Sequence, residues 1–184
     1  PVAALNIALV RAPEQLEDVL GLTPAGLQLS LGVVDGRNVW KNDYEKSLPL
    51  IAKVVELIGA EHVMIAPSCS LLHSPIDLEL ETEIDPEISN WMAFARQKLT
   101  EVIELRQIAE GNTAPLEANR SAIASRRSSK KVHKQAVKDR VAAITDADGT
   151  RKSAFPERQK IQHERFHLPA FPTTTIGSFP QTDD

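Results

Sequence analysis

Three short apolar segments alternate with three stretches of helical periodicity over the first 110 residues. The apolar segments are rich in branched side chains, as buried parallel strands are. The stretches that follow them repeat apolar residues every three or four positions, as one face of a helix does. The segments are residues 5–10, 27–34 and 62–67, and the helical stretches are 14–22, 44–58 and 87–110. The pattern predicts an α/β protein with three parallel β/α units.

Three units are too few to close a domain by themselves. A barrel of eight such units needs about 250 residues, and three near-continuously apolar strands leave apolar edges and faces uncovered. The sequence also begins with Pro1 rather than Met and ends at Asp184, shortly after a motif-like string. We therefore expect the 184 residues to be part of a longer polypeptide.

Composition narrows the class of protein. Hydrophobic residues make up 42% and charged residues 25% of the chain, so a folded core is expected rather than disorder. The 21 basic and 25 acidic residues give a net charge of -4, which argues against a nucleic-acid binder that acts through bulk charge. The single cysteine, Cys69, excludes an internal disulfide and a thiolate-rich zinc site. Because no signal peptide and no apolar run of about 18 residues is present, we expect a cytoplasmic chain without a membrane segment.

Two blocks of opposite charge stand out locally. Residues 120–140 carry eight Lys or Arg against one acid, and every second residue from 77 to 87 is acidic. The basic block is either a site for nucleic acid or another polyanion, or the solvated face of two exposed helices at about 115–126 and 129–145. No aromatic residue is interleaved for base stacking, which favours the helices. The two blocks can also face each other in the fold.

Residues 146–175 are mostly polar or Pro, and we interpret them as an interdomain linker. Within them, His163, Glu164 and His167 form an HExxH string, which on a helix binds zinc and activates water in metallopeptidases. Pro169 ends any helix two residues after the second His, the preceding turns are polar, and no third ligand follows. A chance match on an exposed helix is therefore favoured over a zinc peptidase.

Two loops follow strand ends, where barrel enzymes place functional residues. Cys69 and His73 follow the third strand and suit a nucleophile and base, but no third group orients the base, so a structural role is favoured. The loop after the second strand suits either ligand contact or turn formation and domain packing, and these alternatives stay open. Its candidate residues are Asp35, Arg37, Asn38 and Trp40.

The string FPTTTIGSFPQT, residues 171–182, is the most informative part of the chain. A β-branched run leads into Gly177 and Ser178. A strand end that exposes backbone amides beside a small residue can seat the carboxylate or amino group of a small ligand. Any strand followed by a turn looks similar, so the residues alone do not specify the ligand.

Several strings together resemble one family. PTTTIGSFPQT (172–182) resembles the segment that opens the catalytic domain of cobalamin-independent methionine synthase. SLGVVDGRNVWKND (30–43), APSCSLLHSPIDL (66–78) and WMAFARQKL (91–99) resemble signatures of that family in the same order, and LVRAPEQL (9–16) fits as well. Four ordered matches over nearly the whole chain are much more specific than the five-residue HExxH string.

The resemblance implies an enzyme of two (βα)8 barrels that transfers a methyl group from 5-methyltetrahydropteroyl-polyglutamate to homocysteine, with zinc binding the homocysteine thiolate. It also implies a fold class for this chain, namely α/β with a partial (βα)8 TIM barrel, a helical extension and an interdomain linker. Residues 1–145 would be the last three β/α units of the N-terminal barrel with the extension, 146–171 the linker, and 172–184 the start of the catalytic barrel.

The resemblance further implies that Ile176, Gly177 and Ser178 contact the amino-acid part of homocysteine. The zinc ligands, the pterin-stacking Trp and the proton-donating His belong to later parts of the catalytic barrel and have no counterpart here. The segment is expected to be inactive alone. Its expected partners are the two small-molecule substrates and the remainder of the same polypeptide, which would be a monomer when intact and would bind neither nucleic acid nor membrane.

Overall fold

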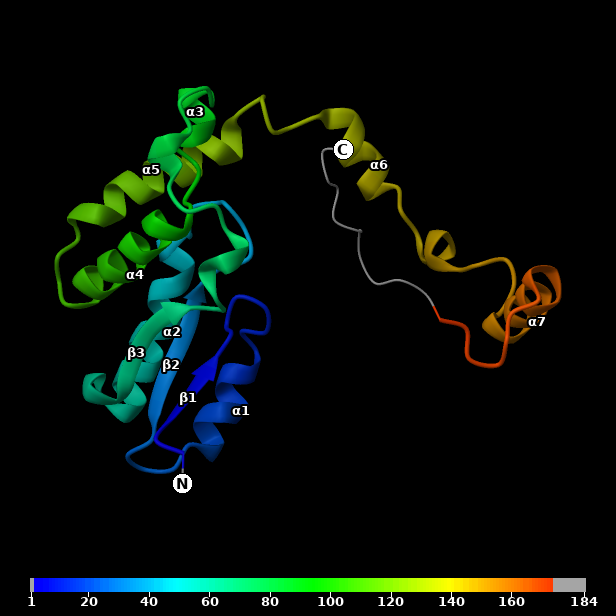
Figure 1. Cartoon of the computed structure of the whole chain (residues 1–184). Helices are drawn as coiled ribbons and strands as arrows, with labels where there is room; N and C mark the ends of the chain where they lie inside the picture. Colours follow the sequence, from blue (N-terminus) through cyan, green and yellow to red (C-terminus); the bar gives the residue numbers. More distant parts are fainter. Residues whose placement is uncertain (1, 174–184) are drawn as a thin grey trace, which may run out of the picture. The chain divides into compact units, whose positions relative to one another are not determined.

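The computed structural model describes residues 2–173 of the chain. The chain divides into two compact units, Pro1–His133 and Lys134–Asp184. The first unit contains a parallel sheet and the helices that pack on it (Figure 1). The described part of the second unit contains two α-helices and a short 3-10 turn. The predicted α/β class is confirmed.

The sheet has three parallel strands, β1 (Ala4–Ile7), β2 (Gln28–Val34) and β3 (Val63–Pro67). Strand β2 lies in the middle, and its Leu29 pairs with Leu5 on one side and Val63 on the other. Figure 1 shows the three arrowheads at the same end of the sheet, as parallel strands joined by helical crossovers require. All three predicted strands are confirmed. The first ends at Ile7, earlier than expected, because the chain turns there and the Leu9 N–H donates to the Ile7 carbonyl.

Two helices join the strands and confirm the predicted stretches. Helix α1 spans Gln15–Leu22 and buries Leu16, and helix α2 spans Tyr44–Ile58 and buries Ile51 and Val54. Helix α2 ends at Gly59, whose φ of 86° lies in the left-handed region that glycine adopts without strain. Short 3-10 helices, η1 (Ala60–His62), η2 (Leu71–His73) and η3 (Leu78–Leu80), lie in the connections before and after β3.

The predicted helix over 87–110 is broken into two. Helix α3 spans Pro86–Ser89 and helix α4 spans Ala95–Ala109. Between them the backbone pairs with the loop after β2, because the Trp91 carbonyl accepts from the Lys41 N–H at 2.8 Å and the Ala93 N–H donates to the Val39 carbonyl at 2.9 Å. Trp91, within this paired segment, is buried. The apolar periodicity of the segment therefore reflects burial rather than one continuous helix.

The core of the first unit lies between the sheet and helices α1, α2 and α4. Residues 31–34 of β2 are all buried, so both faces of the middle strand are covered near its carboxyl end. The buried apolar side chains of this core are Ile7, Leu9, Leu16, Leu29, Leu31, Val33, Val34, Tyr44, Ile51, Val54, Leu105 and Ile108.

Helix α5 (Ala114–Ser128) packs on α2 and α4 and confirms the predicted helix at 115–126. Its buried Asn119 donates to the Asn42 carbonyl at 2.8 Å and accepts from the Tyr44 N–H at 3.2 Å, which ties α5 to the start of α2. The expected helix at 129–145 is shorter, because α6 spans only Gln135–Ala142 and the residues before it form turns.

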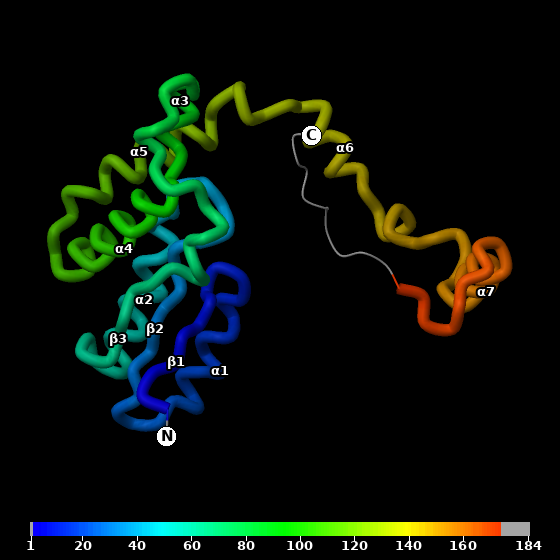
Figure 2. The backbone as a smooth tube through the Cα atoms, in the orientation of Figure 1, coloured from blue at the N-terminus to red at the C-terminus, as the bar shows by residue number. Residues whose placement is uncertain are grey.

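The described part of the second unit is helical but forms no core of its own. It contains α6, a 3-10 turn (Asp146–Gly149) and α7 (Phe155–Phe166), traced as a tube in Figure 2. Neither α6 nor α7 has a buried residue. The interdomain linker expected for residues 146–175 thus contains one helix within its described part. In residues 2–173, no helix combines the length and the apolar character that a membrane crossing needs.

An apolar groove runs along the outer side of β3. It has a volume of about 1020 Å³ and is lined by Val63, Met64 and Ile65 of the strand and by residues of α2 and α4 such as Val55 and Val102. Within the described residues, β3 pairs only with β2, so its other edge carries unpaired backbone groups. A parallel sheet is normally covered on both faces and continued at such an apolar edge.

The close approach of three backbones at Gly32 gives a stability prediction. A Cβ at this position would lie 2.8 Å from both the Ile7 carbonyl oxygen and the Ser68 Cα. We expect Gly32→Ala to lower the free energy of unfolding by about 1–3 kcal/mol, since backbone atoms must shift to admit it. Urea unfolding followed by circular dichroism measures the change.

Gly21→Ala is the matched control, because a Cβ on this α1 residue would meet no atom within 4 Å. Helix propensity predicts that it leaves stability unchanged or raises it by up to about 1 kcal/mol. Equal stability of the Gly32 and Gly21 variants would contradict the tight strand packing described above.

Candidate functional site

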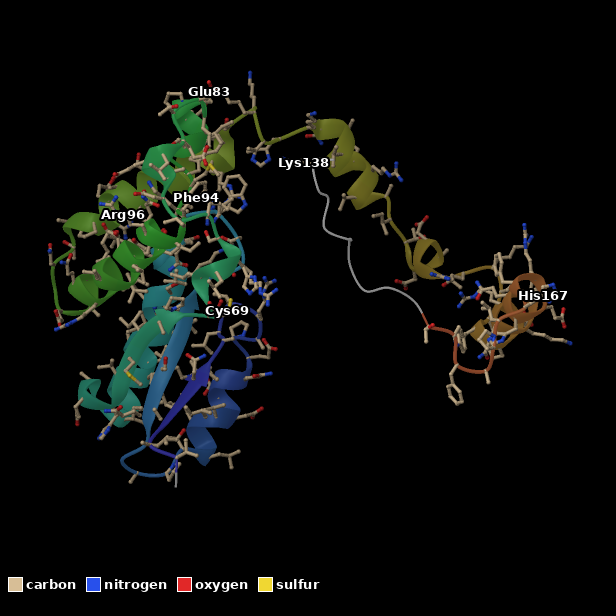
Figure 3. All side chains as sticks on the ribbon, in the orientation of Figure 1. Cys69, Glu83, Phe94, Arg96, Lys138 and His167 are labelled. Atoms are coloured by element: carbon tan, nitrogen blue, oxygen red, sulfur yellow. The ribbon has the colours of Figure 1, made fainter. Side chains whose placement is uncertain are left out.

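The loops after β2 and β3 lie at the carboxyl ends of the strands, where parallel α/β proteins bind ligands. Backbone and side-chain hydrogen bonds join the two loops. The Gly36 N–H donates to the Ser68 hydroxyl oxygen at 3.2 Å, and the Ser68 N–H donates to the Val34 carbonyl at 2.7 Å. A Cβ at Gly36 would lie 2.9 Å from the Cys69 carbonyl oxygen. Figure 3 shows Cys69 in the loop just beyond the strand ends.

Asp35 organises the loop after β2. Its two carboxylate oxygens accept from the Arg37 N–H and the Asn38 side-chain amide, each at 2.8 Å, and the Asn38 side-chain oxygen accepts from the Trp40 N–H at 3.0 Å. Arg11 of the loop after β1 lies 3.8 Å from the same carboxylate. Of the two alternatives for this loop, turn formation and packing is therefore the one these contacts support.

Two buried charged residues on α4 hold this loop, and sequence reasoning missed both. The Lys98 ammonium donates to the Trp40 carbonyl at 3.0 Å and contacts the Asn38 side-chain oxygen at 3.4 Å. The Glu101 Oε1 accepts from the Asn42 N–H at 2.8 Å. Lys98 is fully buried and Glu101 is 4% exposed. The pair clamps the backbone of residues 38–42 onto α4.

A signal for these residues was present in the sequence. Lys98 and Glu101 share one stripe of α4 with the buried Leu105 and Ile108, at the spacing of three and four that marks a core-facing side. Charged side chains on such a stripe must be paired or hydrogen-bonded when buried.

Burial controls the electrostatics of the clamp. It raises the pKa of Glu101 from 4.5 to about 7, opposed by the Asn42 hydrogen bond and the nearby Lys98 charge. The Oε2 atom of Glu101 has no hydrogen-bond partner within the described residues. Burial also lowers the pKa of Lys98. It raises the pKa of Tyr44 as well, whose hydroxyl donates to the Glu104 carboxylate. The site is thus a desolvated network that links α2, α4 and the loop after β2.

Cys69 and His73 do not form a nucleophile and base pair. The Cys69 thiol contacts the Ser70 carbonyl at 3.6 Å, and His73 is an exposed residue at the end of η2. No hydrogen bond joins the two side chains in the described structure. Trp91 is a buried packing residue whose indole N–H donates to the Ser125 hydroxyl at 3.1 Å. These contacts support the structural role favoured from the sequence.

The HExxH string does not have the geometry of a zinc peptidase. Helix α7 ends at Phe166, and His167 follows it in the left-handed conformation with a φ of 53°. His163 and His167 therefore do not lie one turn apart on a single helix, and Figure 3 shows His167 at this helix end. In residues 2–173, no group of three or more His, Cys, Asp or Glu side chains is placed to hold a metal ion.

The two charge blocks do pair in part, as one of the options from the sequence proposed. Lys131 lies 2.6 Å from the Asp85 carboxylate and 2.8 Å from Glu87, which joins the basic block to the acidic one. Arg120 and Arg127 instead pair with carboxylates at the start of α2. Three of the eight basic residues of the block are therefore paired with carboxylates of the first unit.

The predicted homocysteine residues, Ile176, Gly177 and Ser178, lie outside the described residues. The site that the structure does describe is the clamp on α4, with the loops after β2 and β3. It places a rigid, partly charged surface at the carboxyl ends of the strands.

The raised pKa of Glu101 predicts a pH-dependent stability. Between about pH 4.5 and pH 7 the unfolded chain has lost the Glu101 proton while the folded chain still holds it. The free energy of unfolding therefore falls as the pH rises through this range, by at most about 3 kcal/mol. Glu101→Gln keeps an acceptor for the Asn42 N–H but does not titrate, so we expect this fall to disappear in urea unfolding measured from about pH 5 to about pH 8.

The control is Glu117→Gln, which removes the same charge from an exposed position on α5. It is expected to keep the wild-type slope of stability against pH. An unchanged slope in Glu101→Gln would show that this carboxyl group does not carry the effect.

Known proteins resemble this chain over its whole length. Residues 1–59 match the family described as cobalamin-independent synthase, N-terminal domain. The 5-methyltetrahydropteroyltriglutamate–homocysteine methyltransferases of Flavobacterium johnsoniae, Cytophaga hutchinsonii and Saccharomyces cerevisiae are 51%, 53% and 49% identical to it, each over 100% of the chain. The chain spans about a quarter of the length of these relatives, 25%, 25% and 24%. Over its whole length the chain is therefore similar to part of the cobalamin-independent methionine synthases.

Proposed function

We propose that the chain is a segment of an enzyme that transfers a methyl group from 5-methyltetrahydropteroyltri-L-glutamate to L-homocysteine, forming L-methionine. The observation that carries this proposal is the identity of about half of all residues, over the whole chain, with proteins named for that reaction. The segment alone is proposed to be inactive, because it corresponds to about a quarter of those proteins.

The three β/α units are proposed to be the last three of the N-terminal (βα)8 barrel. Two features support this placement. The sheet is parallel with helical crossovers and consecutive strand order, as in a barrel wall. The apolar groove beside β3 also offers Met64 and Ile103 to a further element of the same kind. In a closed barrel that place is taken by the next strand and its helix.

The remaining residues are assigned on the same basis. Residues 1–145 are proposed to be the end of the N-terminal barrel with its helical extension, 146–171 the interdomain linker, and 172–184 the start of the catalytic barrel. The absence of buried residues from α6 and α7 supports the connecting role. A cytoplasmic enzyme that is monomeric when intact, with small-molecule substrates and no nucleic-acid partner, remains the prediction for the whole protein.

Ile176, Gly177 and Ser178 are proposed to bind homocysteine. A backbone without a Cβ at Gly177 allows close approach to the amino-acid group, and the Ser178 hydroxyl can donate to its carboxylate. Both contacts position the substrate without taking part in bond making.

Zinc is expected for the family, but the described residues do not fit it. No cluster of three potential ligands occurs in residues 2–173, and the single cysteine cannot supply a thiolate-rich site. The ligands are therefore assigned to other parts of the polypeptide. The described residues are proposed to hold the N-terminal barrel together and to connect it to the catalytic barrel.

Methyl transfer is measured as methionine formed from homocysteine and the triglutamate donor by the full-length gene product. We expect Ser178→Ala to raise KM for homocysteine about ten-fold, since a hydrogen bond to a charged group is lost. KM for the methyl donor should change little. Ser121→Ala, at an exposed position on α5, is the control and should behave as wild type.

Two outcomes separate the parts of the proposal. If the full-length protein forms no methionine, the activity is wrong. If it is active and Ser178→Ala leaves KM for homocysteine unchanged, only the assignment of residues 176–178 is wrong.

A further inference from the structure

A second cavity lies within the first unit, away from the apolar groove. It has a volume of about 350 Å³ and is formed by the residues that lead into α2, by the last turn of α5 and by the turn after it. Its polar lining is Lys41, Asp43, Lys46, Arg126, Arg127 and His133.

The lining carries more positive charge than its single carboxylate can balance. Asp43 is shared, because its Oδ2 accepts from Arg127 at 2.9 Å and lies 3.8 Å from the Lys46 ammonium. Among the described residues, no carboxylate lies within 4.0 Å of Lys41 or Arg126. Lys41 and Arg126 are therefore not paired with a carboxylate. Arg127 and Lys46 share the single carboxylate of Asp43, which leaves one further positive charge of the cavity unbalanced.

Arg126 is held in position without being neutralised. Its guanidinium lies 3.9 Å from the centre of the Trp40 ring, which fixes the plane of the group by stacking. Burial lowers the pKa of Arg126. Within residues 2–173 its guanidinium makes no hydrogen bond to a side chain or backbone. A stacked guanidinium with free N–H groups along its edge is preorganised for a carboxylate or a phosphate.

Lys41 is also partly desolvated. Its ammonium contacts the Asn90 side-chain oxygen at 3.4 Å, and burial lowers its pKa although Glu101 and Glu104 act in the opposite direction. Taking a cation out of water costs free energy unless an anion compensates. The Asp43 side chain does not cap α2, whose Tyr44 N–H instead donates to the Asn119 side-chain oxygen, so the Asp43 carboxylate stays available to the basic residues of the cavity.

A structural reason accounts for part of this charge. Basic side chains in the last turn of a helix interact favourably with its dipole, which suits Arg126 and Arg127 at the end of α5. It does not account for Lys41 and Lys46, which come from the start of α2 and the residues before it. The convergence of cations from two elements on one cavity therefore points to a ligand.

We propose that this cavity binds a small anion with two or more negative charges, presented as carboxylates or phosphates. A volume of about 350 Å³ is near the lower end for ligand sites, so it admits a tricarboxylate or a pyrophosphate and not a folded macromolecule. Arg126 provides bidentate contact, while Lys41 and Lys46 supply charge from the α2 side.

The test is isothermal titration of the full-length gene product with citrate and, separately, with inorganic pyrophosphate. We expect saturable binding of at least one of them, which weakens as salt is raised. The anion that binds more tightly shows whether the cavity prefers carboxylates or phosphates. Arg126→Gln should weaken binding about ten-fold or more, because a charge-assisted contact is lost. Binding requires neither homocysteine nor the methyl donor, so this proposal can fail while the methyl transfer stands.

Two further variants make the outcome decisive. Lys46→Gln changes an exposed residue of the cavity lining and leaves the packing intact. This variant should weaken anion binding several-fold. It keeps the proposal testable if Arg126→Gln fails to fold. Lys130→Gln removes the same charge from an exposed basic residue that does not line the cavity, and should leave binding unchanged. Absence of binding for both anions, or equal loss in Lys46→Gln and Lys130→Gln, would overturn the proposal.

Discussion

The buried ammonium of Lys98 is the constraint on which the first unit depends. It donates to the Trp40 carbonyl and touches the Asn38 side chain, while Glu101, one turn further along α4, accepts from the Asn42 N–H. A buried cation must find such acceptors or deprotonate. The chain between β2 and α2 therefore has one position relative to α4. That position in turn sets where Trp91 packs and where α5 meets Asn42.

Much of the fold was predictable because periodicity and burial agree. Strands β2 and β3 are both near-continuously apolar, β2 is buried over residues 31–34, and α2 shows an apolar stripe with a terminal glycine. The break at residues 90–94 was not predictable in this way. Trp91 and Phe94 are buried where this segment pairs with a loop distant in sequence, and such a tertiary contact leaves the same apolar pattern as a longer helix.

The site was less predictable than the fold, for two physical reasons. Asp35 looked equally suited to a ligand and to a turn, and only the hydrogen bonds from Arg37 and Asn38 distinguish them. Lys98 and Glu101 show that charged residues on the apolar stripe of a helix belong to the core when they are hydrogen-bonded there. The residues with the strongest family resemblance, 176–178, are outside the described structure, so their role depends on similarity alone.

The stacking of Arg126 on Trp40 makes the fluorescence of Trp40 sensitive to the charge of the cavity. The chain has two tryptophans, and they occupy different environments. Trp91 is buried with its indole N–H donating to Ser125, so its emission depends on the packing of α5. Trp40 is only partly buried and lies 3.9 Å under a guanidinium, so its emission depends on the local electric field. The two signals separate changes in the charge of the cavity from loosening of the helices around it.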